Sequence, residues 1–440
     1  MGVVVATAMS VTIVVGAGLL ALPGISYALA GRYGYLPWLA VALAMIPLLK
    51  IFADFATHHP SAGGVVGYVR LSLGTRMGGI TEVIALGTFS LGIPAIALIG
   101  ADYLRAFLPD MSVTYAAIGL VTLAYVAGML GVKLSGKVQT GLATFIVLGL
   151  LAIGLGFWWQ QSFVVGAPEL EPSVLGMTQG SSGHPMAGIG MDVDTTGWGL
   201  LLQHVVAGVP VVLFAYTGWE LTAFLAEDMH EPEHTLPISI WSSFVLVTGM
   251  YLFIAWLVAT YANDDPGWQT TPFVLLAKAW LGEGAGRVVA LIGVLVVLAN
   301  VVGAFLSASR GIFAAGRDGL LPKQVGYMSS AGEPLLAMTL TWALFVGVIA
   351  LTQASELGVG LLLQLAGQNF FVLYLLTAVG YIHQFQSHSH RRWIGALSVL
   401  TVLAMMWTFS LAGVIYCACL AGIGYALSCS APQATKAPFR

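Results

Sequence analysis

The sequence carries few charged residues for its length, and this excludes an ordinary soluble protein. Only 8% of its 440 residues are Asp, Glu, Lys or Arg, against about 25% in soluble domains, while 58% are hydrophobic. The net charge of −3 offers no basic surface to a nucleic acid. We therefore expect a polytopic helical membrane protein without a nucleic-acid partner.

Cysteine is also scarce, and no cysteine spacing indicates a metal or redox site. Cys417, Cys419 and Cys429 all lie in or beside the last apolar run, in a pattern that fits neither a disulfide framework nor a zinc site. The sequence also lacks a zinc-protease signature, a G-x-S-x-G serine and a catalytic aspartate pair. These absences predict a protein that is not an enzyme and holds no cofactor or metal.

Long apolar runs dominate what is present. A membrane-crossing helix needs about 20 apolar residues. Such runs predict twelve spans, at 3–30, 36–57, 80–107, 112–131, 138–160, 199–228, 237–261, 286–314, 334–352, 357–383, 391–408 and 410–428. Eleven Lys and Arg fall on one side of this arrangement and four on the other, with Lys50 inside the second span. The positive-inside rule then places both termini in the cytoplasm and the basic-free loop 161–198 outside.

The first span contains residues that interrupt a helix. Gly16, Gly18, Pro23 and Gly24 fall within it, and no charge occurs from Met1 to Gly31. Gly costs about 1 kcal/mol and Pro about 3 kcal/mol relative to Ala in a helix interior. Open backbone inside hydrocarbon survives only where it lines a cavity or meets a ligand. The pattern therefore predicts a broken helix. Alternatively, these glycines are packing notches, positions without a side chain where a neighbouring helix can approach closely.

A second break is predicted in the sixth span. Pro210 removes a backbone hydrogen bond, Tyr216-Thr217-Gly218 is a plausible unwound segment, and Glu220 lies just beyond it. A carboxylate at membrane depth indicates function, although Glu220 could instead be a buried partner for the freed backbone. Two interrupted spans at corresponding positions predict an inverted-repeat transporter with a central site. Its five-span halves would be 1–160 and 199–385, followed by two extra helices at 391–428.

The second span carries two charges that can satisfy each other. Lys50 and Asp54 are four residues apart and therefore share one helix face. Pairing reduces the cost of placing both charges within a membrane. We expect a structural ion pair here.

Short motifs in order along the chain support the same architecture. They are Gly16-Ala17-Gly18 with Pro23, the run Pro60 to Val65, Gly218-Trp219-Glu220, Ala226-Glu227-Asp228 with Pro232 and Pro237, and Ser309-Arg310 with Ala315 to Gly319 and Pro322. With them, the chain resembles the amino acid–polyamine–organocation (APC) transporters. Within that superfamily it is most similar to bacterial exporters of L-methionine and branched-chain amino acids, through Pro60 to Val65, Gly92 to Ala95 and Trp158-Trp159.

This resemblance implies an all-α, LeuT-like fold of 5+5 inverted repeats with broken helices 1 and 6. It also implies where an amino acid binds. The substrate carboxylate would meet backbone N–H groups near Ala17, Gly18 and Leu19. The amino group would meet carbonyls near Val14, Val15, Phe214 and Ala215. Gly16, Tyr216 and Gly218 complete the predicted binding set, and Trp219 and Glu220 are the predicted gating and coupling residues.

The nature of the substrate and of the coupling ion is less strongly specified. The spans proposed to line the site offer no basic side chain, and Phe89, Phe214, Tyr216 and Trp219 lie in them, which favours Met, Leu, Ile or Val. A lysine found in the fifth span of some proton-coupled relatives is missing here. Protons acting through Glu220 are the preferred coupling ion. Sodium held by Ser307 and Ser309 is a weaker alternative, because serines in membrane helices usually bond their own backbone.

These features together predict a secondary transporter in the bacterial inner membrane, working as an exporter by alternating access. The export direction depends on the resemblance alone. An uptake permease, an exchanger and a non-transporting amino-acid sensor of the same fold remain open, as do a monomer and a homodimer.

Overall fold

The structure is a computed structural model of the 440-residue chain. It describes residues 2–15, 17–59, 64–130, 136–163, 197–219, 231–263, 265–317, 319–329, 332–355 and 357–430. The predictions made for Gly16, Glu220, Pro60 to Gly63, Ala226 to Asp228 and most of the loop 161–198 therefore lie outside the described residues.

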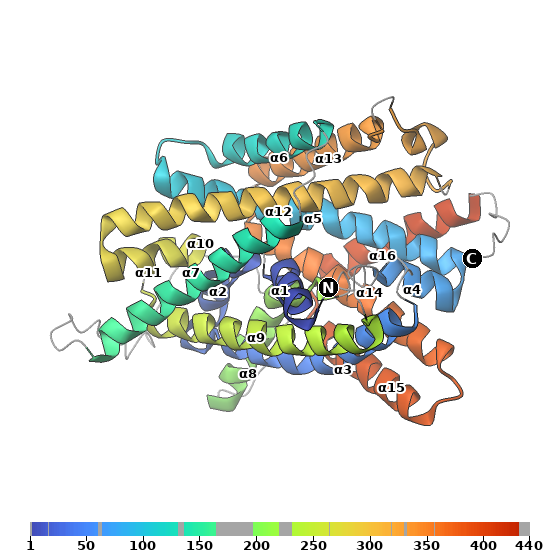
Figure 1. Cartoon of the computed structure of the whole chain (residues 1–440), viewed down its shortest axis with the longest axis horizontal. Helices are drawn as coiled ribbons and strands as arrows, with labels where there is room; N and C mark the ends of the chain where they lie inside the picture. Colours follow the sequence, from blue (N-terminus) through green and yellow to red (C-terminus); the bar gives the residue numbers. More distant parts are fainter. Residues whose placement is uncertain are drawn as a thin grey trace.

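Within the described residues, all regular secondary structure is helical (Figure 1). The α-helices are α1 (Val3–Val14), α2 (Ala17–Ala30), α3 (Leu36–His58), α4 (Gly64–Leu73), α5 (Thr75–Phe107), α6 (Val113–Met129), α7 (Gly136–Phe163), α8 (Gly197–Val212), α9 (Pro232–Tyr261), α10 (Gly267–Thr270), α11 (Pro272–Leu281), α12 (Glu283–Arg317), α13 (Leu335–Ala354), α14 (Val359–Gln384), α15 (Ser389–Met406) and α16 (Leu411–Ser430). Short 3₁₀ turns are η1 (Gly31–Tyr33), η2 (Leu213–Tyr216) and η4 (Lys323–Gly326).

The helix bounds follow the predicted spans closely wherever the apolar run is uninterrupted. The second span was expected at 36–57 and α3 occupies Leu36–His58; the last two were expected at 391–408 and 410–428 and are α15 and α16. Seven of the described helices are long and apolar enough to cross a membrane: α3, α5, α9, α12, α13, α14 and α16. The all-α polytopic fold is thereby confirmed. The count of twelve spans stays a prediction, since α6 has only 17 residues and the first and sixth spans are divided.

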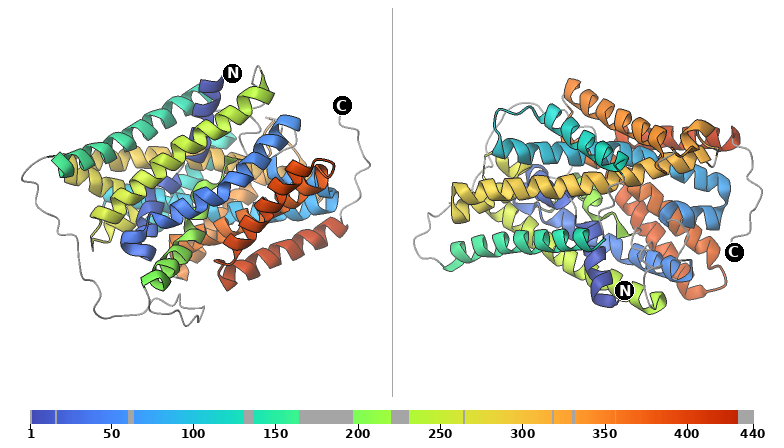
Figure 2. Two further views of the ribbon diagram at one scale, coloured as in Figure 1. Left: turned by 90° about the horizontal axis from the view of Figure 1, so that it is seen from below. Right: turned by 45° about the horizontal axis from the view of Figure 1, so that its top comes forward.

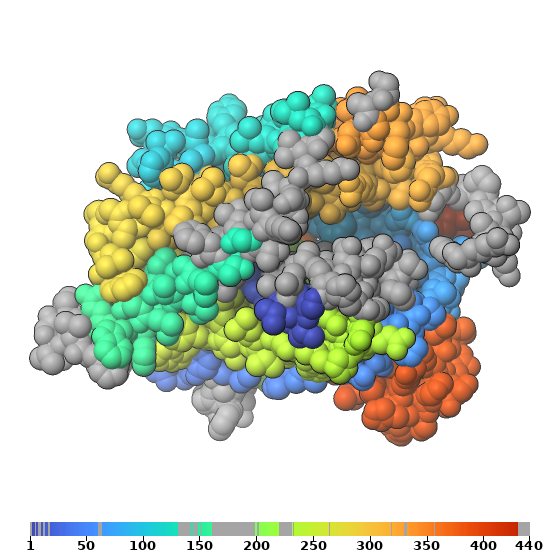
Figure 3. Space-filling view, viewed as in Figure 1, coloured from blue at the N-terminus to red at the C-terminus, as the bar shows by residue number. Residues whose placement is uncertain are grey.

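The long helices form a bundle whose axes run broadly along the longest dimension of the molecule (Figures 1 and 2). α5 and α12 cross its middle and pack against each other, α6 and α13 cover one edge, and α3 and α9 lie along the opposite edge. α15 projects from one corner, where its surface is visible in Figure 3. The short helices α1 and α2 pack against α9, and the beginning of α1 reaches the surface in Figure 3. The break between them lies within the bundle, since Val14 and Val15 are each only 6% exposed.

Three short helices were not predicted as spans. α4 has ten residues and α11 also has ten, each far short of the length that crosses a bilayer. Both are amphipathic connections: α4 packs on α5 and α14, and α11 packs on α12 and α7. The four-residue α10 lies against α2.

The predicted pair in the second span is present and has a third member. Lys50 Nζ lies 2.7 Å from Asp54 Oδ1, and the hydroxyl of Tyr381 in α14 donates to the other carboxylate oxygen. Asp54 is buried, with 7% of its surface exposed, whereas the Lys50 side chain reaches outward and is 45% exposed. Both oxygens of this buried carboxylate are therefore bonded, and the contact joins α3 to α14.

Histidines extend this contact to α15. His58 Nδ1 donates to the carbonyl of Asp54 at 2.7 Å, which leaves Nε2 to accept from Arg391 at 3.3 Å. Arg391 also lies over the Phe385 ring, 4.5 Å from its centroid. Burial and the neighbouring His58 lower the pKa of His59, so its imidazole stays neutral at neutral pH. The end of α3 is thus joined to both α14 and α15.

We predict that Tyr381→Phe destabilises the protein by about 1–3 kcal/mol, because it leaves one oxygen of a buried carboxylate without its donor. The measurement is thermal unfolding of the purified protein in detergent. Tyr115→Phe is the matched control: it removes the same hydroxyl from a side chain that is 78% exposed, and should change stability by less than about 0.5 kcal/mol. Equal effects of the two changes would contradict the role given to Tyr381.

Candidate functional site

The first span is broken where its glycines begin. α1 ends at Val14, and Val15 leaves the helical conformation with φ −78° and ψ 87°. The chain resumes as α2 at Ala17. Pro23 lies inside α2 and does not end it. The predicted break is present, but it falls at the beginning of the Gly/Pro stretch and not across its whole length.

The sixth span is broken after Pro210. α8 ends at Val212, tightens into the 3₁₀ turn η2 and then becomes extended at Thr217, with φ −94° and ψ 160°. Gly218 follows with φ +110°, a backbone conformation that residues with a Cβ rarely adopt. This is the unwound segment expected at Tyr216-Thr217-Gly218. A glycine is needed there because the backbone turns through this left-handed conformation.

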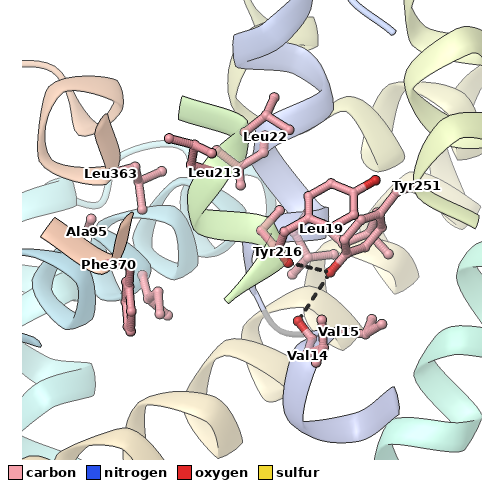
Figure 4. Close-up of a cluster of buried hydrophobic side chains, with 14 of the residues drawn as sticks. Val14, Val15, Leu19, Leu22, Ala95, Leu213, Tyr216, Tyr251, Leu363 and Phe370 are labelled. Carbon is pink, nitrogen blue, oxygen red and sulfur yellow. Dashed lines mark hydrogen bonds between the residues drawn. The ribbon is translucent and has the colours of Figure 1, made fainter. Parts of the chain in front are cut away.

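The two breaks meet in the folded chain. A Cβ added to Gly18 would lie 3.8 Å from Ala215 Cα, in ordinary van der Waals contact. α2 packs against α8 and η2, so the beginning of one interrupted helix faces the end of the other (Figure 4). Residues about 200 positions apart in sequence therefore form one local site.

The glycines of the first span have different roles. At Gly18 a Cβ would come within 3.1 Å of only the flexible end of Leu22. At Gly24 it would lie 2.0 Å from the carbonyl oxygen of Trp268 in α10, which cannot move aside. Gly24 is thus a packing notch, as the alternative interpretation held. Protein packing alone gives no comparable reason for glycine at position 18.

The broken ends expose backbone groups of both polarities. The N–H groups of Ala17, Gly18 and Leu19 are in the first turn of α2, where no residue four positions earlier in that helix can accept from them. The last carbonyls of α1, such as that of Val14, likewise have no N–H four positions later within that helix to accept from. A helix N-terminus favours an anion and a helix C-terminus favours a cation. This is the polarity that an amino acid zwitterion requires.

Two of the predicted carbonyls share a donor that the sequence did not reveal. The Tyr251 hydroxyl of α9 lies 3.1 Å from the carbonyl oxygen of Val14 and 3.3 Å from that of Ala215 (Figure 4). The carbonyl of Phe214 instead accepts from both the N–H and the hydroxyl of Thr217, at 3.3 and 2.8 Å. Of the predicted carbonyls, Val14 and Ala215 are therefore held together by a neighbouring helix.

Aromatic and aliphatic side chains surround the breaks. Leu19, Tyr216 and Trp219 have no exposed surface, and Val14, Val15 and Ala215 are at most 6% exposed. Trp219 packs edge-on against Phe244, with ring centroids 5.7 Å apart. The residues of the two breaks that the structure describes include no charged side chain. Of Ala17 only the backbone is described.

A cluster of three phenylalanine rings joins the sixth-span break to α5 and α14. Phe370 of α14 lies 6.3 Å from Phe214 and 6.3 Å from Phe89, centroid to centroid. Two glycines permit this packing. A Cβ at Gly92 would lie 2.9 Å from the Phe214 ring, and a Cβ at Gly367 would lie 2.8 Å from the carbonyl oxygen of Pro210. Phe214 and Phe89 were predicted near the site; Phe370 and the two glycines were not. An aromatic residue in an apolar span gives no sequence signal of its neighbours.

The serines proposed as sodium ligands bond within their own helix. Ser307 donates to the carbonyl of Gly303 at 2.9 Å and Ser309 to that of Phe305 at 2.8 Å. Ser307 is exposed and Ser309 is buried, so the two side chains point in different directions. This is the backbone-bonded role that the sequence left open. In the part of the chain that the structure describes, no three His, Cys, Asp or Glu side chains group as metal ligands would.

Comparison with known proteins finds sequence similarity over almost the whole chain. A sequence model of the amino acid permease family matches residues 1–435. A protein of Bacillus subtilis (strain 168), named uncharacterized amino acid permease YecA, is 25% identical over 428 residues, which cover 95% of this chain and 93% of YecA.

Two further relatives carry the names of transporters with different substrates. The L-methionine/branched-chain amino acid exporter YjeH of Escherichia coli (strain K12) is 24% identical over 370 residues, covering 83% of this chain and 81% of YjeH. Cationic amino acid transporter 2, vacuolar, of Arabidopsis thaliana is 24% identical over 314 residues, covering 68% and 48%. Because the family match spans every described helix, this multi-pass, all-α membrane protein belongs to the amino acid permease family.

Proposed function

We propose that this chain is a secondary active transporter that moves neutral apolar amino acids across a bacterial inner membrane by alternating access. The proposal rests on one observation: the interrupted ends of the first and sixth spans lie against each other in the folded chain. The carbonyls of Val14 and Ala215 converge on the hydroxyl of Tyr251, and a Cβ at Gly18, in the first turn of α2, would lie 3.8 Å from Ala215 Cα. Backbone groups of this polarity suit the carboxylate and the ammonium of one amino acid.

The substrate side chain is inferred from what surrounds the breaks. Leu19, Phe214, Tyr216 and Trp219 make the surroundings of the breaks apolar, and no charged side chain occurs among the described residues of the breaks. A charged side chain buried there without a partner would cost several kcal/mol. Methionine, leucine, isoleucine and valine fit this environment, and the similarity to YjeH, a protein named for methionine and branched-chain amino acids, agrees with them.

Coupling to protons through Glu220 and outward transport complete the proposal. Burial disfavours the ionised form of a carboxyl group, so a buried carboxyl can exchange protons near cellular pH. Direction follows the gradients acting on a reversible carrier, and export is inferred from the similarity to YjeH alone. The 5+5 repeat, 1–160 against 199–385, is the arrangement in which two broken helices meet at a shared centre. An uptake permease or exchanger would use the same site.

We predict that radiolabelled leucine or methionine undergoes counterflow in proteoliposomes that contain the purified protein. Excess unlabelled methionine, leucine or valine should compete, whereas arginine and glutamate should compete at least about 100-fold less well, because their side-chain charges would be buried unpaired. Stronger competition by arginine or glutamate than by methionine would contradict the substrate class. Binding without counterflow would indicate a sensor and overturn the transport function.

The second prediction concerns Gly18. Gly18→Val should abolish amino acid binding and leave the detergent-stable monomer largely intact, because the added side chain would lie beside the first N–H groups of α2, while a Cβ at this position would closely approach only the flexible end of Leu22. Binding is measured by scintillation proximity and folding by size-exclusion chromatography.

The control for Gly18 is Gly24, in the same helix. Gly24→Ala should destabilise the protein by about 1–3 kcal/mol through overpacking against the Trp268 carbonyl, with affinity retained in the protein that folds. Loss of folded Gly18→Val protein to the same extent as Gly24→Ala would show that Gly18 too is a packing notch.

The third prediction concerns Glu220. Glu220→Gln keeps the side-chain shape and removes the titrating proton. It should abolish transport driven by a pH gradient across the vesicle membrane and preserve binding and counterflow. The measurement is substrate flux with and without an imposed pH gradient. Parental pH-driven flux in the variant would leave Glu220 with a structural role only.

A further inference from the structure

Two arginines lie at the beginning of α15, where a helix favours the opposite charge. Arg391 and Arg392 are the third and fourth residues of this helix, its first turn contains no acidic residue, and the N-cap His388 makes no side-chain capping bond. The N-terminus of a helix carries a partial positive charge, so a cation there is unfavourable and an anion is favourable. An anion from outside the helix would therefore stabilise this end of α15.

The helices packed against α15 leave the two charges uncompensated. α15 packs on α3 and α14, and the only acidic residue in these three helices is Asp54, which is already paired with Lys50. Residues 357–440 contain no Asp or Glu at all. Among the residues that the structure describes, no ion pair includes Arg391 or Arg392. Two positive charges thus remain at this corner of the bundle.

The two guanidinium groups are held differently. Arg391 donates to His58 Nε2 at 3.3 Å, and its guanidinium carbon lies 4.5 Å from the centroid of the Phe385 ring. A guanidinium has five N–H donors, so the bond to His58 leaves most of them available. Arg392 is exposed, and its side chain makes no hydrogen bond to any other described residue. One arginine is therefore fixed in place, and the other can turn toward a ligand.

Beyond the arginines, α15 presents an uncovered apolar face. Trp393, Leu397, Leu400 and Trp407 follow one another at intervals of four, three and seven residues, so they lie along one side of the helix, and each is at least 54% exposed. Figure 3 shows the orange-red surface of α15 open at one corner of the molecule. Tryptophan is enriched where a membrane meets water. Trp393 therefore indicates that the adjoining arginines lie at the level of the lipid headgroups.

We propose that Arg391 and Arg392 bind the headgroup of an anionic phospholipid whose acyl chains lie along the apolar face of α15. The phosphate oxygens of the lipid would accept from the guanidinium groups, and arginine suits this contact because two parallel N–H groups can meet two oxygens. The negative charge of the lipid would offset the two charges that the protein leaves uncompensated. A zwitterionic lipid has the same phosphate, but its ammonium cancels that charge. This inference does not depend on which substrate the protein moves.

The test compares dioleoylphosphatidylglycerol with dioleoylphosphatidylcholine, which have the same acyl chains and differ in headgroup charge. Each lipid is titrated into the purified full-length protein in detergent, and bound lipid is counted by native mass spectrometry. The anionic lipid should bind at least about tenfold more tightly than the zwitterionic one, because basic residues near a membrane surface each attract anionic lipid. Equal affinities for the two lipids would overturn the inference.

Arg392→Gln tests the location of the site. This variant should bind the anionic lipid about fivefold more weakly and the zwitterionic lipid as before, since one basic residue is lost. Arg392→Lys keeps the charge and should stay within about twofold of the parent. Lys323→Gln is the control at another exposed cation, in η4, which packs on α12 and α13, and it should leave both affinities unchanged.

Three results would overturn the assignment to α15. They are unchanged lipid affinity in Arg392→Gln, an equal loss in Lys323→Gln, and a lipid-free dimer that dissociates in Arg392→Gln, which would give this face to a second copy of the chain. Thermal unfolding of each variant separates lost binding from lost fold. If Arg392→Gln unfolds at a lower temperature than the parent, the comparison of Arg392→Lys with the parent decides, since a charge-dependent site keeps its lipid in that variant.

Discussion

Backbone N–H and C=O groups that leave a helix inside hydrocarbon must find other partners, and the centre of this molecule is built around that requirement. The chain interrupts two helices and places the open ends together. Tyr251 supplies a donor to one carbonyl from each break, and Thr217 supplies donors to a third. The groups that remain in the first turn of α2 are those suited to a ligand. Some backbone groups of the breaks are thus bonded within the protein, and in the proposed function the others would meet the ligand.

Close packing holds this open backbone in place. Gly367 of α14 lets that helix approach the carbonyl of Pro210, and Gly92 of α5 leaves room for the Phe214 ring. Gly218 provides the positive φ that carries the chain out of η2. Gly367 therefore lets another helix reach the interrupted backbone, whereas Gly92 makes room for a side chain of the break. The surrounding long helices therefore act as a frame, and α1, α2 and η2 are the elements that it positions.

The difference between backbone groups and side chains at the breaks also bears on the different substrates for which the relatives are named. Relatives of this chain carry names that refer to methionine and branched-chain amino acids in one case and to cationic amino acids in another. The proposed site would meet the carboxylate and ammonium through backbone groups, and so would recognise what all amino acids share. Selectivity would then depend on side chains near the breaks, such as Phe214 and Phe370. A single architecture can thereby serve several substrates.

The sequence by itself determined the features that depend on local chain chemistry. The span from Leu36 follows from the length needed to cross a bilayer, the Lys50–Asp54 pair from helical spacing, and the two breaks from Gly and Pro within apolar runs. Only the tertiary structure decided that Gly24 is a packing notch while Gly18 faces Ala215, and that Tyr251 and Phe370 adjoin the breaks. A tyrosine in an apolar helix carries no mark of its partner, because that partner is 237 residues away and is chosen by how the helices pack.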